Sequence, residues 1–290
     1  MNTLWSKYVQ GTKTLYYSRK LRFDDLFSEQ YRNLFGLDAK QQMKILEIGC
    51  GPGALAGALH RWYPLAEITA VDRDSEFVRF GTENEPGVNF VEGDATALPF
   101  EDNTFDVTIS NTVAEHIEPS KFYGEQLRVL KPGGICLVLS SRKGININPS
   151  CITFNEYEQQ FWKKAEQHDD SMDRFAVCKY PMNEAEMPVV MSEYGFSNVS
   201  TGFATIDLTP DNPKFSAPLA LDMINANRYT ALDGIDSVLH TMPEHFTTGE
   251  VEEMKRLANA KYDTRIEQYQ RGEKQWDTNV SIIMVIRGTK

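Results

Sequence analysis

The chain has 290 residues, of which 41% are hydrophobic and 19 are glycine, a composition typical of folded globular proteins. This length allows a large buried core, and we expect one domain with insertions. The chain carries 30 lysines and arginines against 41 acidic residues, a net charge of −11, so its surface as a whole is unsuited to binding nucleic acid.

The cysteines and the apolar segments exclude several other classes. Cys50, Cys136, Cys151 and Cys178 have neither CxxC spacing nor neighbouring histidines, so we expect reduced thiols and no metal site. The first residues lack the apolar core of a signal peptide, and no stretch approaches the roughly 20 apolar residues of a membrane span. The sequence therefore predicts a cytoplasmic protein that does not bind membranes.

Residues 1–40 are predicted to form an N-terminal arm and a cap helix. Up to Arg22 the arm contains five basic residues and no acid, together with several aromatic residues. We expect Tyr16, Tyr17 and Arg19 to cover an anionic or aromatic ligand, and removal of residues 1–22 to leave the sheet folded. An ordinary solvated surface segment is the alternative.

Residues 41–141 alternate short β-rich runs with helical periodicity, which is typical of parallel strands joined by crossover helices in a doubly wound α/β sheet. Ligands of such sheets bind at the carboxyl ends of the strands. The predicted strands are KILEIG at 44–49, EITAVD ending at Asp72, VNFVEGD ending at Asp94, FDVTISN ending at Asn111 and GICLVLSS at 134–141.

The rest of the chain is predicted to interrupt the sheet twice. The second insertion is largely helical, and we expect its longest helix to begin at Thr247, which has the capping-box spacing to Glu250, and to end before Gly272. The predicted segments are a first lid insertion at 142–181, a core helix and sixth strand at 182–208, the second insertion at 209–275 and a terminal strand at 276–290.

The glycine turn GCGPGA at residues 49–54 fits two kinds of cofactor site. As GxGxxA it suits a dinucleotide, and together with Glu47 it gives the ExGxGxG pattern of a site for S-adenosylmethionine (SAM). A pyrophosphate requires positive potential at a helix N-terminus, whereas SAM carries a sulfonium and an ammonium group. Glu47 would repel the first ligand and attract the second.

Two carboxylates follow the next strands. Asp72 lies 23 residues after Gly49, where it can bind the ribose hydroxyls of either cofactor. Asp94 is placed to accept a hydrogen bond from an adenine amino group, and the Ala95 backbone N–H can donate to a ring nitrogen. An ordinary turn residue is the alternative for Asp94.

Five motifs, ILEIGCGPG, AVDRD, EGDATALPF, FDVTISNTVAEHI and RVLKPGG, occur in an order and spacing that resemble those of class I SAM-dependent methyltransferases. The resemblance covers about residues 40–141. It implies a Rossmann-like sheet of strand order 3-2-1-4-5-7-6 whose last strand is antiparallel. It also implies that the turn and Asp72 hold methionine and ribose, while Asn111 borders the transferred methyl. The cofactor-binding residues it implies are Glu47, Gly49, Cys50, Gly51, Asp72, Arg73, Asp94, Ala95 and Asn111.

The segment after the fourth strand bears on the chemistry. It reads Ser110-Asn111-Thr112-Val113, so the Asn/Asp-Pro-Pro-Tyr clamp of nucleobase N-methyltransferases is missing. Methyl transfer from a sulfonium is an in-line displacement that depends mainly on alignment. His116, which follows Glu115, is the candidate catalytic base. The alternative is a histidine bonded to the backbone at a helix start.

The sequence thus predicts a SAM-dependent methyltransferase that acts on a small molecule under a lid formed by the arm and the insertions. Two alternatives stay open, an NAD(P)-dependent oxidoreductase and a SAM-binding regulatory protein without catalysis. No assembly interface can be recognised in a single chain, so the sequence predicts no oligomeric state.

Overall fold

The computed structural model describes residues 5–169, 174–175 and 177–290. In this part of the chain, helices and strands alternate up to residue 147, and long helices follow later. The elements are α1 Trp5–Tyr8, α2 Thr12–Arg22, η1 Asp25–Phe27, α3 Ser28–Phe35, β1 Met43–Ile48, α4 Ala54–Trp62, β2 Ala66–Asp72, α5 Ser75–Asn84, β3 Asn89–Glu92, β4 Phe105–Asn111, η2 Ala114–His116, α6 Pro119–Val129, β5 Leu130–Ile147, α7 Glu156–His168, α9 Glu186–Glu193, β6 Ser197–Asp207, α10 Ala217–Thr241, α11 Thr248–Gln270 and β7 Thr278–Thr289.

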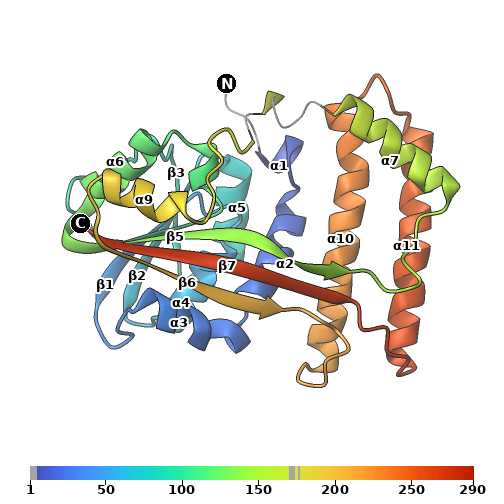
Figure 1. The fold of residues 1–290 in the computed structure, drawn as a ribbon, viewed down its shortest axis with the longest axis horizontal. Helices are drawn as coiled ribbons and strands as arrows, with labels where there is room; N and C mark the ends of the chain where they lie inside the picture. Colours follow the sequence, from blue (N-terminus) through green and yellow to red (C-terminus); the bar gives the residue numbers. More distant parts are fainter. Residues whose placement is uncertain (1–4, 170–173, 176) are drawn as a thin grey trace.

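The strands form one seven-stranded sheet of order β3-β2-β1-β4-β5-β7-β6, which confirms the predicted order (Figure 1). Strands β1 to β5 are parallel, and β7 runs antiparallel to β5 and β6. The carboxyl ends of β1, β2 and β4 therefore meet at one edge of the sheet.

Helices cover both faces of the sheet, because neighbouring strand residues point to opposite sides. Ile45 of β1 packs in a core cluster with residues of α3 and α4, whereas the next residue, Leu46, packs in another cluster with Val129 of α6. A third cluster joins α6 and α9 to β5 and β7. Burial on both faces explains why the central strands are almost continuously apolar.

Strand β5 is longer than expected. It continues to Ile147, where the sequence predicted an end at Ser141 and the start of an insertion at residue 142. The added residues pair with β7 after an irregularity between Arg142 and Ile145. At Gly144 a Cβ would overlap the carbonyl oxygen of Val280, so glycine permits the close approach of the two backbones.

Helices α7, α10 and α11 form a helical lobe beside the sheet with a core of its own (Figure 1). The predicted capping box is present, since Thr247 and Glu250 bond reciprocally. The prediction that this helix is the longest is wrong, because α10 has 25 residues and α11 has 23. None of the described helices combines the length and apolarity needed to cross a membrane.

A buried ion cluster fastens the helical lobe to the sheet. Arg265 of α11 is fully buried and binds Asp277 at 2.6 Å and Asp211 at 2.9 Å. Asp211 also accepts the backbone N–H groups of Gln275 and Trp276, at 2.7 and 2.8 Å. The cluster thereby fixes the chain immediately before β7.

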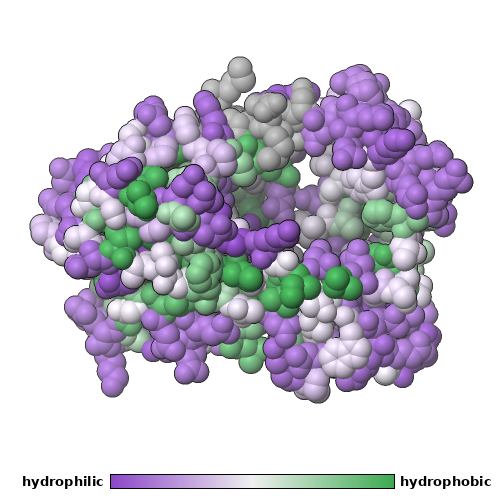
Figure 2. Space-filling model, viewed as in Figure 1, coloured by the Kyte–Doolittle hydropathy of each residue, from purple (hydrophilic) through white to green (hydrophobic). Residues whose placement is uncertain are grey.

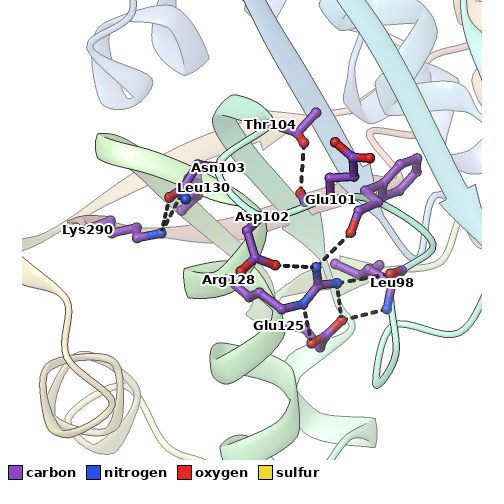
Figure 3. Close-up of polar contacts among 10 residues, drawn as sticks. Leu98, Glu101, Asp102, Asn103, Thr104, Glu125, Arg128, Leu130 and Lys290 are labelled. Carbon is purple, nitrogen blue, oxygen red and sulfur yellow. Dashed lines mark hydrogen bonds and ion pairs between the residues drawn. The ribbon is translucent and has the colours of Figure 1, made fainter.

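A second polar network stabilises the loop between β3 and β4 (Figure 3). Arg128 of α6 donates to the carbonyl oxygens of Phe100 at 2.7 Å and Leu98 at 3.0 Å, and it pairs with Asp102 and Glu125. Glu125 in turn accepts the Leu98 N–H at 2.6 Å. This loop contains Asp94 and Ala95, which the sequence assigned to adenine binding, and the network fixes the part of the loop that follows them.

Candidate functional site

A cavity of about 610 Å³ opens at the carboxyl ends of β1, β2 and β4. Its volume is within the usual range for small-molecule sites, and its place is where open α/β sheets bind ligands. The strand ends form one side of it. Parts of the arm and of residues 174–175 and 177–180 also line it, and we call these parts the outer wall. Figure 2 shows the surface hollowed between the sheet and the helical lobe.

The glycine turn lies at the inner side of the cavity in a backbone conformation that favours glycine. Gly49, Gly51 and Gly53 have φ values of 66°, 53° and 92°. A Cβ at Gly49 would lie 2.6 Å from Val113, and one at Gly53 would lie 2.5 Å from the Phe90 ring. Conformation and close contacts together require glycine at both positions.

Asp72 lies at the end of β2 and lines the same cavity. Its carboxylate accepts the Gly51 N–H at 2.8 Å and the Asp74 N–H at 2.9 Å. Burial raises the pKa of Asp72, and these two hydrogen bonds oppose the rise. The carboxylate is thus held in one orientation between the glycine turn and the loop after β2.

Glu47 is a buried acid without a counter-charge. Its side chain is 2% exposed and lines the cavity, and its Oε2 has no hydrogen-bond partner among the described residues. Burial and the nearby Asp72 raise the pKa of Glu47 well above its ordinary value, and the Ala56 backbone N–H opposes this. A cationic group bound in the cavity would supply the missing partner.

Asp94 and Ala95 also line the cavity, beyond β3. Asp94 accepts two hydrogen bonds of 2.8 Å from the backbone N–H and hydroxyl of Thr96, so it does act as a turn residue. Its contact with adenine stays a prediction. The other implied cofactor residues, Cys50, Arg73 and Asn111, line the cavity as well.

The arm contributes to the cavity, but not through the predicted tyrosines. Tyr16 is buried and donates to Glu85 at 2.6 Å, and Tyr17 is 44% exposed beside Tyr229 of α10. Neither lines the cavity, whereas Arg19 does. The prediction is wrong for both tyrosines because the helical face of α2 that carries Leu15 and Arg19, one turn apart, faces the cavity instead.

Backbone hydrogen bonds hold the arm at two positions, one within α1 and one directly before α2. The N–H of Ser6 donates to Asp74 at 2.8 Å, and the N–H of Gly11 donates to Asp233 of α10 at 2.9 Å. The Trp5 ring lies edge-on to His116, with ring centroids 4.9 Å apart. The described arm is therefore packed structure and not a solvated surface segment.

His116 lines the cavity just after β4. Its Nδ1 accepts the Cys178 backbone N–H at 2.9 Å, and burial lowers its pKa. A neutral imidazole that accepts at Nδ1 carries its proton on Nε2, so neither nitrogen is available as a base. The geometry favours the alternative of a histidine bonded to the backbone.

Several cavity residues carry no sequence signal that would have revealed them. They come from α1, from the residue directly after α2 and from the segment before α9, outside the motifs in sequence. This group contains Trp5, Phe23, Arg174, Phe175, Lys179 and Tyr180. Of these residues, only Trp5 belongs to the basic, aromatic part of the arm, up to Arg22, that the sequence predicted to cover a ligand.

Comparisons with known proteins agree with this geometry. A family described as a methyltransferase domain matches residues 46–138. Over 103 residues the chain is 40% identical to phthiotriol/phenolphthiotriol dimycocerosates methyltransferase 1 of Mycobacterium ulcerans, covering 34% of this chain and 38% of that protein. Over 108 residues it is 38% identical to a fatty-acid O-methyltransferase of Mycolicibacterium smegmatis, covering 36% and 39%. The matches thus span less than half of each relative.

Among solved structures, the chain resembles phosphoethanolamine N-methyltransferase 2 of Haemonchus contortus in complex with S-adenosyl-L-methionine. The TM-score is 0.53 at 17% identity, and the similarity covers 100% of this chain and 60% of that one. At this identity the similarity concerns the fold alone.

Proposed function

We propose that this chain, whose residues 46–138 form a class I SAM-dependent methyltransferase domain, transfers the methyl group of SAM to a small-molecule acceptor. The observation that carries the proposal is Glu47, a buried carboxylate without a partner that lines the cavity between the glycine turn and Asp72. Such a carboxylate favours a cationic ligand, and SAM is a cationic cofactor.

The residues at the strand ends fit this cofactor. The glycine turn and Glu47 would hold its methionine part, Asp72 its ribose hydroxyls, and Asp94 and Ala95 its adenine. The sulfonium supplies a methyl group that a nucleophile can displace. A pyrophosphate, in contrast, would place its negative charges beside two buried carboxylates, which disfavours NAD(P).

The protein's contribution to the reaction is alignment and exclusion of water. The bond between carbon and sulfur breaks as the bond to the acceptor forms, and an acceptor that carries a proton releases it. Because His116 is engaged by Cys178, we infer that His116 does not take up this proton. The outer wall covers the cavity and keeps water from the reacting atoms.

The acceptor is proposed to be a small molecule. The relatives above are named for lipid acceptors, and a demethylmenaquinone methyltransferase of Renibacterium salmoninarum is 35% identical over 119 residues. Since each match spans less than half of the relative, none of these acceptors is assigned to this chain. A cytoplasmic location stays a prediction from the sequence.

Calorimetry with SAM, its demethylated product S-adenosylhomocysteine (SAH) and NAD tests the cofactor. We expect binding of SAM and SAH only, and about a hundredfold loss of affinity in Asp72→Ala, because hydrogen bonds to a charged group contribute about 1.5–3 kcal/mol. Asp38→Ala is the matched control, since Asp38 is exposed and outside the cavity. Wild-type affinity in a folded Asp72→Ala variant would remove the assignment.

Transfer of labelled methyl groups to a metabolite extract tests the reaction. We expect label in a small-molecule fraction with the wild type and none with Asp72→Ala. Tight SAM binding without any transfer would instead identify a SAM-binding regulatory protein.

A further inference from the structure

Arg19 of α2 is a cation without a partner in the wall of the cavity. It is half-buried, and its side chain makes no hydrogen bond or ion pair with any residue that the structure describes. Burial and the charge of Arg22 lower the pKa of Arg19 to about 9, while the charge of Glu115 opposes this. Taking a guanidinium out of water is costly unless an anion binds it, so Arg19 favours an anionic ligand in the cavity.

The face of α2 that carries Arg19 lies against the glycine turn. Leu15, one turn before Arg19, also lines the cavity, and a Cβ at Gly51 would lie 3.3 Å from the Leu15 Cδ2. Residues four apart on a helix are neighbours on one face, so Arg19 begins about 6 Å along the helix from this contact. The Gly51 N–H in turn donates to Asp72 at 2.8 Å. Arg19 thus belongs to the surroundings of the glycine turn.

The segment after β4 is also near Arg19. The charge of Glu115 in η2 acts on Arg19, although no ion pair within 4 Å joins the two side chains. The same segment reaches the glycine turn, since a Cβ at Gly49 would lie 2.6 Å from Val113. Arg19 therefore lies near the place where the glycine turn meets the residues after β4. The proposed function puts the methionine part of SAM in this part of the cavity.

Glu47 is a second uncompensated charge beside the glycine turn, and its sign is opposite. Its Oε2 has no hydrogen-bond partner among the described residues, and it does not pair with Arg19. A free α-amino acid group carries an ammonium and a carboxylate on one carbon atom. A single ligand group of this kind would compensate both Glu47 and Arg19. SAM carries such a group, whereas NAD(P) does not.

Resting on the proposed function, we propose that Arg19 is a cofactor-binding residue that binds the carboxylate of the methionine part of SAM, while Glu47 binds its ammonium group. The planar guanidinium matches a carboxylate through two parallel N–H donors. The arm thus supplies one cofactor residue from outside the five sequence motifs. The anionic ligand that the sequence predicted Arg19 to cover is then the cofactor's own carboxylate.

Calorimetry with two matched ligands tests the proposal on the unmodified full chain. SAH is compared with its decarboxylated form, which keeps the adenosine, the sulfur and the amino group. We expect SAH to bind at least about tenfold more tightly, because the decarboxylated form lacks the charge-assisted hydrogen bonds of the carboxylate. Equal affinities would overturn the proposal. If the wild type bound no SAH, the proposed function itself would fail, and this proposal with it.

Arg19→Gln tests whether Arg19 causes this difference. We expect the variant to lose about tenfold or more in SAH affinity and to bind the decarboxylated form at least as tightly as the wild type does. Arg19→Lys keeps the charge without the paired donors and should retain part of the preference for SAH. Lys13→Gln is the matched control, since Lys13 is an exposed cation of α2 outside the cavity. It should leave both affinities unchanged.

Three results with these variants would overturn the proposal. Unchanged SAH affinity in Arg19→Gln, with loss of methyl transfer, would place Arg19 at the acceptor instead. An equal loss of affinity for both ligands would indicate a structural role. An equal loss in Lys13→Gln would indicate an effect of net charge alone. The melting temperature of each apoprotein verifies folding, and Arg19→Lys supplies the same comparison if Arg19→Gln does not fold.

Discussion

The two sides of the cavity are held in different ways. At the strand ends, Asp72 is fixed by backbone N–H groups of the glycine turn and of its own loop. The outer wall combines α1, α2 and residues 174–175 and 177–180. Contacts over long sequence distances hold these segments, such as Gly11 with Asp233 and Cys178 with His116. The strand-end side therefore depends on local motifs, whereas the outer wall depends on how segments distant in sequence pack.

Arg265→Ala should have the largest effect. It tests whether the helical lobe can unfold while the strand-end side of the cavity still binds SAH. Removing Arg265 leaves Asp211 and Asp277 buried without a counter-charge, which costs about 3–5 kcal/mol. We expect the helical lobe to unfold at lower denaturant while SAH binding at the strand ends persists. Arg271→Ala, at a position of 55% side-chain exposure just after α11, is the control. Simultaneous loss of the lobe and of SAH binding would show that the two sides are one cooperative unit.

Gly53→Ala tests whether the glycine turn at the strand ends tolerates a side chain. Gly53 and Gly133 both have positive φ, 92° and 79°, so alanine should cost about 1–2 kcal/mol at either position. Only at Gly53 does the added Cβ meet a neighbour, the Phe90 ring, which adds about 1–3 kcal/mol. Chemical denaturation of both variants, with SAH calorimetry, measures the difference. Equal destabilisation would mean that Phe90 moves aside freely.

Glu47→Gln should stabilise the apoprotein although it removes a side chain that we assign to SAM binding. Because burial raises the pKa of Glu47 above its unfolded value, the folded apoprotein binds more protons than the unfolded chain between these two pKa values. Its stability therefore falls as pH rises through that window. We expect the Glu47→Gln apoprotein to gain at least about 2 °C in Tm at pH 7, to lose this gain near pH 4, and to bind SAM more weakly. A lower Tm at pH 7 would contradict the assignment of Glu47 as an uncompensated charge.

His116→Ala and Trp5→Ala should have the smallest effects and act on the outer wall alone. An edge-to-face aromatic pair contributes about 0.5–1.5 kcal/mol, so each variant should change acceptor KM or turnover by about two- to tenfold with unchanged SAH affinity. A double-mutant cycle with both substitutions measures the coupling. Complete loss of turnover in His116→Ala, with normal SAH binding, would instead identify a general base.

The sequence predicted the strand-end side because the signals there are local. The glycine turn, Asp72 and Asp94 lie in short motifs whose spacing determines their place at the sheet edge. The wrong prediction for Tyr16 and Tyr17 has a different origin. Composition identified a basic, aromatic helix, but only packing against α4, α5 and α10 decides which face of that helix meets the cavity.

The positions of Lys179 and Tyr180 in the cavity and the extension of β5 were not predictable either, because both depend on contacts between segments that are distant in sequence. Lys179 and Tyr180 reach the cavity because the backbone N–H groups of Cys178 and Tyr180 donate to η2, which is distant in sequence. The last residues of β5 contain Lys143 and Gly144, which interrupt the apolar alternation that signals a strand. Pairing with β7 overrides this weak local preference.

The placement of β7 between β5 and β6 has a consequence for biosynthesis. Residues 278–289 are synthesised after the other six strands of this sheet, yet they lie between β5 and β6. Until they are synthesised, β5 and the later β6 have open hydrogen-bonding edges towards the gap. The nascent chain thus carries exposed strand edges while the helical lobe is being made, and chaperones that recognise extended segments would act in this interval.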